Sequence, residues 1–227
     1  MNTSLLTKRC HEQQLQVQAQ GAILEGSLVV PQHAEELIIF VQIDRSCRLN
    51  PQNYYLAHIL QQHEFATLLL DLLPLEDRSV SRRGECLHYD ISTLAMRLTQ
   101  VPDFLLAHPD TQHLKMSYLG LQRGGEVAIL SAAERPQSIH STILLGCDTD
   151  RLSTVLPYVK SATLLLLEDN SSPNLEQCHH SLAQLASDHS LLTFHCFGSI
   201  LSSSNDLEFV GRQMSQWLKH HHETPGY

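Results

Sequence analysis

Short apolar runs alternate with amphipathic segments along almost the whole chain, and this alternation constrains the fold more than any other feature. The run at residues 37–41 is continuously apolar, which is typical of a strand buried on both faces of a parallel sheet. Further strands are predicted at residues 67–73, 116–120, 142–147, 162–167 and 191–197. Helices are predicted at residues 51–63, 90–107, 126–134, 175–186 and 206–220. Strands that alternate with helices predict a mostly parallel α/β sheet with right-handed crossovers and helices on both faces.

Residues 13–30 follow a different pattern, in which polar and apolar side chains alternate on either side of Gly21. Alternation with a period of two around a glycine turn predicts an antiparallel hairpin with one face exposed to water. With the hairpin, the predicted sheet has about eight strands. No linker or low-complexity stretch interrupts the series. The sequence therefore predicts a single domain over residues 1–227, with residues 1–12 and 219–227 as loose termini.

The charge balance argues against one large class of partner. The chain has 227 residues, with 15 Lys and Arg against 24 Asp and Glu, and a formal net charge of −9. An acidic chain with scattered basic residues is a poor match to the phosphate backbone of a nucleic acid. Its apolar runs are also far shorter than the roughly 18 residues that a membrane span needs. Neither nucleic acid nor membrane is expected as a partner.

The cysteines and the first residues bear on localisation. Residues 1–14 contain no apolar stretch of the kind found in secretory signals. The six cysteines are widely spaced, which favours free thiols in a reducing compartment over disulfides. We therefore expect a cytoplasmic protein. The cysteines are Cys10, Cys47, Cys86, Cys147, Cys178 and Cys196.

Fifteen histidines raise the question of a metal site. The densest groups of histidine and cysteine lie at residues 178–180, 195–196 and 220–222. None has the spaced pairs of a zinc site, and adjacent residues on a helix point in different directions. We expect no metal and no cofactor.

Several stretches of the middle third carry a family pattern. They are residues 41–53, residues 67–73 with Asp77, Arg82 and Arg83, and residues 117–133. On these stretches the chain resembles the dienelactone hydrolase-like family of small α/β-hydrolases. The resemblance extends with weaker specificity from Leu15 to Leu218. It implies the α/β-hydrolase fold, with the active site at the carboxyl ends of the strands.

The position of the nucleophile departs from the family pattern. The family places a serine or cysteine in the turn G-x-S/C-x-G between a strand and a helix, and this turn is called the nucleophile elbow. In this chain the elbow, residues 120–124, reads Gly-Leu-Gln-Arg-Gly, so Gln122 stands where the nucleophile would be. An amide side chain cannot be deprotonated near neutral pH and forms no acyl-enzyme. The resemblance thus implies the elbow without its nucleophile.

The other two members of the triad are displaced or replaced as well. The resemblance implies Ser171 at the position of the acid, and the nearest carboxylate, Asp169, comes two residues early. It implies the histidine near Ser199, in the loop at residues 198–205, which contains no histidine. His195 lies about four residues too early, within the predicted strand. A Ser-His-Asp mechanism needs all three groups in place, so hydrolysis by this set is not expected.

The oxyanion loop of the family, with the pattern H-G-x-G, corresponds to Gln42-Ile43-Asp44-Arg45. Glycines let the backbone turn its amides toward a reacting carbonyl, and β-branched Ile43 and bulky Arg45 resist those conformations. The negative charge of Asp44 would oppose a developing oxyanion.

We therefore expect a catalytically inactive protein, a pseudoenzyme that binds a ligand or partner through the former active-site cleft. The cleft is expected between residues 42–48, residues 122–124 and Ser171. A small ligand, a protein partner and a second copy of the chain in a homodimer all remain open as partners. The expected ligand-binding residues are Gln42, Asp44, Arg45, Gln122 and Arg123.

The basic residues around this cleft suggest an anionic ligand. Arginine recognises carboxylate and phosphate well, although neighbouring acidic residues, Glu76, Asp77 and Glu85, could equally pair with some of them. The arginines concerned are Arg45, Arg48, Arg78, Arg82, Arg83 and Arg123.

The alternative is an active hydrolase of small esters or lactones with a non-standard catalytic set. The fallback candidates for that set are Cys147, Asp169 and His195, brought into place by a shifted loop. Cys47 is a further candidate nucleophile. The simpler interpretation of Cys147 is a small buried side chain, because its acidic neighbours Asp148 and Asp150 would lower its reactivity.

Overall fold

The computed structural model describes residues 11–43, 46–74, 90–149, 152–168, 175–194 and 203–222. These residues form one eight-stranded sheet in the order β1-β2-β4-β3-β5-β6-β7-β8, which is parallel from β4 to β8. Its strands are β1 (Glu12–Ala19), β2 (Ala22–Val29), β3 (Glu36–Gln42), β4 (Ala66–Asp71), β5 (Lys115–Leu121), β6 (Ile139–Leu145), β7 (Ala162–Glu168) and β8 (His189–Phe194). The predicted α/β sheet is confirmed, including its antiparallel hairpin.

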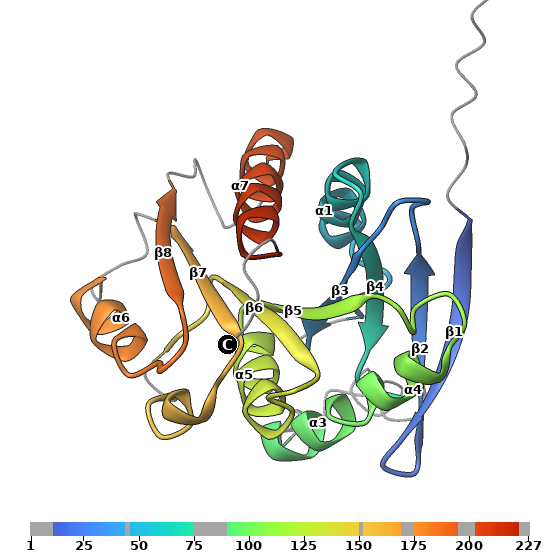
Figure 1. The fold of residues 1–227 in the computed structure, drawn as a ribbon, viewed down its shortest axis with the longest axis horizontal. Coiled ribbons are helices and arrows are strands. Elements are labelled where there is room, and N and C mark those ends of the chain that lie inside the picture. Colours follow the sequence, from blue (N-terminus) through green and yellow to red (C-terminus); the bar gives the residue numbers. More distant parts are fainter. Residues whose placement is uncertain are drawn as a thin grey trace, which may run out of the picture.

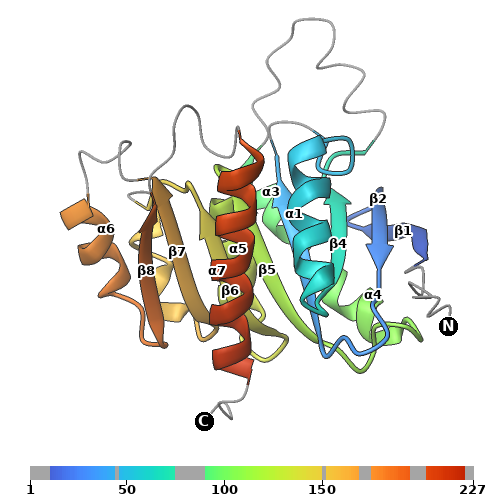
Figure 2. The same cartoon turned by 90° about the horizontal axis from the view of Figure 1, so that it is seen from above.

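Helices cover both faces of the sheet (Figures 1 and 2). On one face lie α1 (Pro51–Gln62) and α7 (Ser204–His222), which pack against each other. On the other face lie α3 (Ile91–Leu98), α4 (Val101–Ala107), α5 (Gly124–Glu134) and α6 (Leu175–Leu182), with the short 3-10 helix η2 (Leu156–Tyr158). None of the helices in the described ranges is long and apolar enough to cross a membrane.

Strand β3 shows how the apolar runs build two cores. Because side chains alternate between the faces of a strand, Ile38 and Phe40 join the core under α1 and α7. Leu37, Ile39 and Val41 join the core under α3, α4 and α5. A strand covered on both faces has no polar face, which is why the run at residues 37–41 is continuously apolar.

The hairpin has the alternating burial that its sequence predicts. Leu15, Val17 and Ala19 are buried on the face toward α4, and the intervening residues are exposed on the other face. The two-residue turn, Gln20-Gly21, has positive φ at both residues, as a type I′ turn requires.

Several element boundaries differ from the sequence-based prediction. The single helix predicted at residues 90–107 is two helices, α3 and α4. Pro102 lies in the first turn of α4, where its missing N–H leaves no bond unsatisfied, whereas it would break the interior of a longer helix. Strand β6 starts and ends earlier than predicted, and Gly146, with a φ of 64°, turns the chain before Cys147. Helix α7 extends to His222, two residues beyond its predicted end.

Candidate functional site

The carboxyl ends of the parallel strands bring several polar residues to one edge of the sheet. Gln42 ends β3, Asp71 ends β4, and Gln122 and Arg123 follow β5. Six of the predicted site residues lie outside the described ranges. These are Asp44, Arg45, Asp169, Ser171, His195 and Ser199.

The elbow keeps the backbone of a strand-to-helix turn. Gln122 has a φ of 50°, in the left-handed region that side chains other than glycine rarely adopt. Its N–H donates to the Leu145 carbonyl at 2.9 Å, and its own carbonyl accepts from the Gly125 N–H at 3.0 Å. Helix α5 begins two residues later, at Gly124. The Gln122 and Arg123 side chains are both exposed. The turn thus presents Gln122 at the edge of the sheet.

Three glycines make this turn possible through packing. A Cβ on Gly124 would lie 2.1 Å from the Val41 carbonyl oxygen, and a Cβ on Gly120 would lie 2.5 Å from the Gly125 Cα. A Cβ on Gly125 would lie 2.1 Å from the Cys147 Sγ. The Gly124 contact would force the start of α5 away from β3, and the Gly120 contact would force it away from β5. The Gly125 contact would crowd the Cys147 side chain, which follows β6. The shape of the elbow therefore follows from close packing and does not depend on the side chain at position 122.

The side chain at the tip of the elbow determines what this turn can do. The Gln122 carboxamide offers a hydrogen-bond donor and an acceptor but no nucleophile. It can bind a polar group, and it cannot form a covalent acyl intermediate.

Neither described cysteine near the site is placed to substitute for the missing nucleophile. Cys147 is 3% exposed, and its thiol contacts the Gly120 carbonyl oxygen at 3.4 Å. Burial raises the pKa of Cys147 well above its usual range. Burial, with the nearby charge of Asp71, does the same to the pKa of Cys47. Because the thiolate is the reactive form, both environments are those of structural thiols.

The described residues of the β3–α1 loop, Ile43 and 46–50, follow β3, which is the neighbour of β5 in the sheet. The Gln42 side chain at its start is 6% exposed, and its Oε1 accepts from the Asn53 Nδ2 at 2.7 Å and the Asn50 Nδ2 at 3.2 Å. Asn50 also caps α1, because its side-chain oxygen accepts from the Gln52 N–H at 3.1 Å. The side-chain carbonyl of Gln42 is thus engaged inside the protein.

Asp71, at the end of β4, binds residues 46–48 of the same loop. It was not among the predicted site residues. Its carboxylate is 2% exposed and accepts from the Cys47 N–H at 2.6 Å, the Ser46 hydroxyl at 2.9 Å and the Arg48 Nε at 3.0 Å. The sequence signal that could have revealed it is a single carboxylate at the end of an apolar strand.

Two arginines predicted to surround the cleft differ in their environment. Arg48 pairs with Asp71 and with Glu25 of β2, so it ties the loop to the hairpin and is not available to an anion. Arg123 is exposed, and within the described part of the chain no carboxylate pairs with it. The other candidate arginines, Arg45, Arg78, Arg82 and Arg83, lie outside the described ranges.

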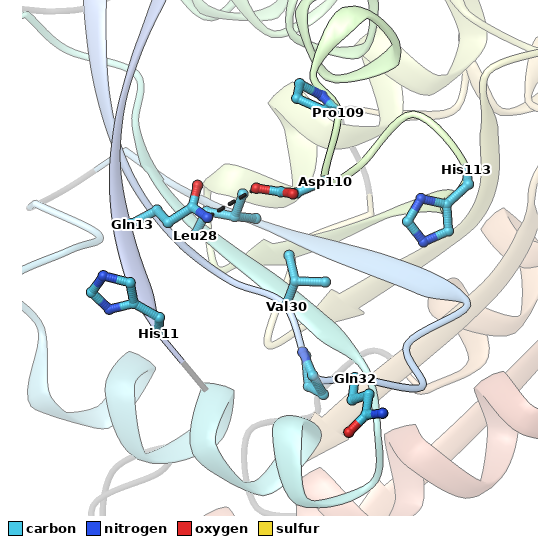
Figure 3. Close-up of a pocket in the computed structure, with 9 residues that line it drawn as sticks. His11, Gln13, Leu28, Val30, Gln32, Pro109, Asp110 and His113 are labelled. Carbon is cyan, nitrogen blue, oxygen red and sulfur yellow. Dashed lines mark hydrogen bonds between the residues drawn. The ribbon is translucent and has the colours of Figure 1, made fainter. Parts of the chain in front are cut away.

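The hollows that described residues line lie away from the elbow. One, of about 320 Å³, lies where the hairpin meets the turn after α4, between His11, Val30 and His113 (Figure 3). A larger one, of about 990 Å³, follows the amino ends of β5, β6 and β7. Within the described residues, no group of three or more His, Cys, Asp or Glu side chains could hold a metal ion.

The comparisons with known proteins agree with this geometry. No family model matches the chain. The crystal structure of a dienelactone hydrolase from Anabaena variabilis is 34% identical, with a TM-score of 0.87, and the match covers 93% of this chain and 98% of that one. The esterase Pf2001 of Pyrococcus furiosus is 12% identical, with a TM-score of 0.73 and a match covering 93% of each chain, which shows the shared fold.

Two curated proteins of Mycobacterium tuberculosis, provisionally named as phosphoribosyl transferases, are 28% identical over 215 residues, or 95% of this chain. The chain spans about half the length of these curated relatives, 48%. The dienelactone hydrolase is similar over nearly its whole length, and the order of strands and helices is the same α/β-hydrolase fold. The chain belongs to the dienelactone hydrolase-like family of the α/β-hydrolase superfamily.

Proposed function

We propose that this chain is a catalytically inactive α/β-hydrolase that binds a ligand at the edge of the sheet where its family carries the nucleophile. The observation that carries the proposal is Gln122, exposed at the tip of an elbow whose backbone is otherwise intact. A carboxamide at that tip can hold a polar ligand without reacting with it. The two described thiols near the site, Cys47 and Cys147, are buried and cannot easily replace the nucleophile.

The test is a panel of p-nitrophenyl esters and small lactones, assayed with the parent chain and with a Cys47→Ala, Cys147→Ala double variant. We expect both proteins to match the uncatalysed rate. Turnover by the parent that the double variant loses would establish a cysteine hydrolase and overturn the proposal.

The alternative function is hydrolysis by a displaced set that includes Asp169 or His195. Neither residue lies in the described ranges, so the substitutions have to address them directly. Turnover by the parent that Asp169→Asn or His195→Gln abolishes would favour this alternative. Gln122→Ser supplies the control, since it restores a hydroxyl at the elbow. With no triad partner to activate it, we expect this variant to remain inactive.

The chemistry of the elbow favours an anionic ligand. Arg123 and Gln122 are adjacent, both exposed, and follow β5 at the carboxyl edge. A guanidinium beside a carboxamide donor suits the oxygens of a carboxylate or a phosphate. We expect small carboxylates and phosphates to raise the melting temperature of the parent and to have no such effect on Arg123→Glu. Arg212→Glu, an exposed arginine of α7, is the matched control and should respond like the parent. If no anion shifts the parent, the ligand is not anionic.

The mycobacterial relatives favour one member of this anion class, a phosphorylated ribose. The match to half of their length leaves open which half carries the activity in their name. Phosphoribosyl pyrophosphate therefore belongs in the ligand panel, together with nucleobases as acceptors. Binding that depends on Arg123, without transfer to a base, would assign a sugar phosphate as ligand. Transfer to a base would make the chain an enzyme and overturn its inactivity.

A further inference from the structure

We propose that β1 is the interface of a symmetric homodimer, in which its outer edge pairs antiparallel with the outer edge of β1 in a second copy of the chain. β1 is the first strand of the sheet order, so only β2 pairs with it among the described strands. Both views of the fold place β1 at the margin of the sheet (Figures 1 and 2). This surface is distinct from the elbow, and the proposal does not depend on the proposed function.

The geometry of the hairpin identifies the backbone groups that point outward. In a two-residue hairpin the closing pair, here Ala19 and Ala22, is hydrogen-bonded across the ladder, and bonded pairs then recur at every second residue. Odd-numbered residues of β1 therefore bond to β2. The N–H and C=O groups of the even-numbered residues point toward the open edge. These residues are Glu12, Gln14, Gln16 and Gln18.

This edge lacks the features that keep edge strands from pairing. Such strands are commonly short, bulged, or broken by lysine or proline. β1 has eight residues, pairs with β2 in an uninterrupted register, and contains neither lysine nor proline. Glu12 is its one charged residue. The outward groups thus form a regular, nearly neutral ladder without a second partner strand in the described part of the chain.

The edge is also held in place before any partner arrives. At one end of β1, the Gln13 side chain donates to the Asp110 carboxylate at 2.9 Å (Figure 3). At the other end, the Gln20 N–H donates to the Gln100 Oε1 at 2.8 Å. Between them, Leu15 and Val17 are anchored in the core. Pairing along a strand that is already ordered costs less conformational entropy than ordering a free segment.

Charge and symmetry favour a second copy as the occupant. Each chain carries a net charge of −9, so two copies repel except where their surfaces are neutral, and β1 has no charge from Gln13 to Ala19. A two-fold axis at Leu15 places Gln14 opposite Gln16 of the second copy, and Glu12 opposite its Gln18. The Gln14 side chain is already bound within its own chain, because it accepts from the Arg48 Nη1 at 2.9 Å and donates to the Ser27 hydroxyl at 2.9 Å. Complementarity across the two-fold axis therefore comes from the backbone, since each outward-facing residue offers one donor and one acceptor. The four residue pairs in this register exchange about eight backbone hydrogen bonds.

The first test is sedimentation velocity on the full chain over a range of concentrations. We expect a concentration-dependent dimer in the parent and a monomer in Gln16→Pro. Proline at this outward-facing position removes an N–H from the open edge and no bond to β2. Gln16→Thr changes the side chain, keeps the N–H, and should remain dimeric. Circular dichroism checks that each variant is folded. A parent that stays monomeric, or a folded Gln16→Pro that stays dimeric, overturns the proposal.

The second test addresses the register. Gln14→Lys with Gln16→Lys places lysine opposite lysine in the proposed dimer, and Gln14→Lys with Gln16→Glu places lysine opposite glutamate. Like charges directly opposite each other destabilise an antiparallel pair, and opposite charges stabilise it. We expect the first variant to raise the dimer dissociation constant by about tenfold or more relative to the second. Equal dissociation constants would refute the register.

Hydrogen exchange locates the interface without a substitution. The amides of Gln14, Gln16 and Gln18 should exchange slowly at high protein concentration and quickly at low concentration. The amides of Leu15 and Val17, which bond to β2, should be protected at both. A dimer in which the three even-numbered amides exchange quickly at all concentrations uses another surface, and would overturn the proposal.

Discussion

The elbow and the β3–α1 loop follow neighbouring parallel strands at the same edge of the sheet, and opposite kinds of interaction hold them. The elbow is shaped by the absence of side chains, because Gly120, Gly124 and Gly125 let the backbone of α5 approach β3 and β6. The loop is shaped by side chains, because Asp71 binds its backbone, and Gln42 binds Asn50 of the loop and Asn53 of α1.

This difference shows that the backbone shape of an active site can persist when its reactive side chains are replaced. Glycine contacts at the elbow are needed to pack a helix on a sheet, so the turn persists when Gln122 replaces a nucleophile. The polar groups of the loop are satisfied inside the protein, which leaves fewer of them for a substrate. Of the four substitutions below, three test whether these two regions are held as described, and Glu36→Gln tests a buried carboxyl group elsewhere in the sheet; they follow in order of decreasing effect on stability.

Replacement of Asp71 should have the largest effect on stability, since it removes the carboxylate at the centre of the loop's hydrogen bonds. Asp71→Ala leaves the Cys47 N–H and the Ser46 hydroxyl without their acceptor, and leaves Arg48 with Glu25 and the Gln14 side chain. Breaking one side of a buried ion pair typically costs about 4 kcal/mol of unfolding free energy. Urea denaturation measures this loss. The control is Glu208→Ala, which breaks an exposed pair with Arg212 and should cost about 0.5 kcal/mol or less. Similar losses in both variants would mean that Asp71 does not organise the loop.

At the elbow, Gly124→Ala should cause the largest loss of stability of any single added methyl group. Its Cβ would collide with the Val41 carbonyl oxygen, a backbone atom that cannot rotate away. Overpacking of this kind costs about 3 kcal/mol. The matched control is Gly26→Ala, whose Cβ would meet the flexible end of the Leu68 side chain at 2.9 Å. Thermal unfolding of both variants should show the larger loss for Gly124→Ala. Equal losses would argue that the elbow is not packed against β3 as described.

The fold was predictable from the sequence because burial determines the spacing of apolar residues within each strand and helix. The apolar run at residues 37–41 indicated a strand covered on both faces, and the alternation around Gly21 indicated the hairpin. The break between α3 and α4 was missed because Pro102 is compatible with a helix start as well as with a helix end.

The site was predictable only in part, because its contacts join distant parts of the chain. Gln122 could be identified from the glycines that flank it. The engagement of Arg48 by Asp71 could not, since the two residues are 23 positions apart and meet only after β3 and β4 pair. The Gln42 side chain was expected in the cleft, and no local pattern indicates that Asn50 and Asn53 bind it instead.

A second buried carboxyl group, Glu36, lies at the start of β3. Glu36 accepts a hydrogen bond from Ser117, and burial raises its pKa from 4.5 to about 7. The folded state therefore binds a proton more tightly than the unfolded chain does. This contribution to stability is complete below about pH 4.5 and is lost as the pH rises through about 7.

Glu36→Gln should remove this pH dependence. We expect the unfolding free energy of the variant to exceed that of the parent by about 2 to 3 kcal/mol at pH 8, because the parent must then bury a charged carboxylate. The advantage should disappear as the pH falls below about 4.5, where the parent carboxyl is protonated in both the folded and the unfolded state. Urea denaturation at several pH values measures the difference. Parallel stability curves for the two proteins would show that Glu36 is ionised at little cost.

The smallest expected effect is the most informative about function. Gln122 holds a left-handed backbone conformation that costs a side chain other than glycine about 1 kcal/mol. Gln122→Gly should therefore stabilise the protein by up to about 1 kcal/mol, reduced by the greater freedom of glycine in the unfolded chain. Arg123→Gly is the control, because Arg123 has an ordinary φ of −62° and the variant should lose stability.

If glycine can replace a strained residue with a gain in stability, the side chain of that residue is not needed for the fold. If Gln122→Gly gains stability while the anion response of the parent is lost, the carboxamide is the group that binds. If Gln122→Gly loses stability as Arg123→Gly does, the side chain of Gln122 supports the fold, and the binding role of the elbow fails.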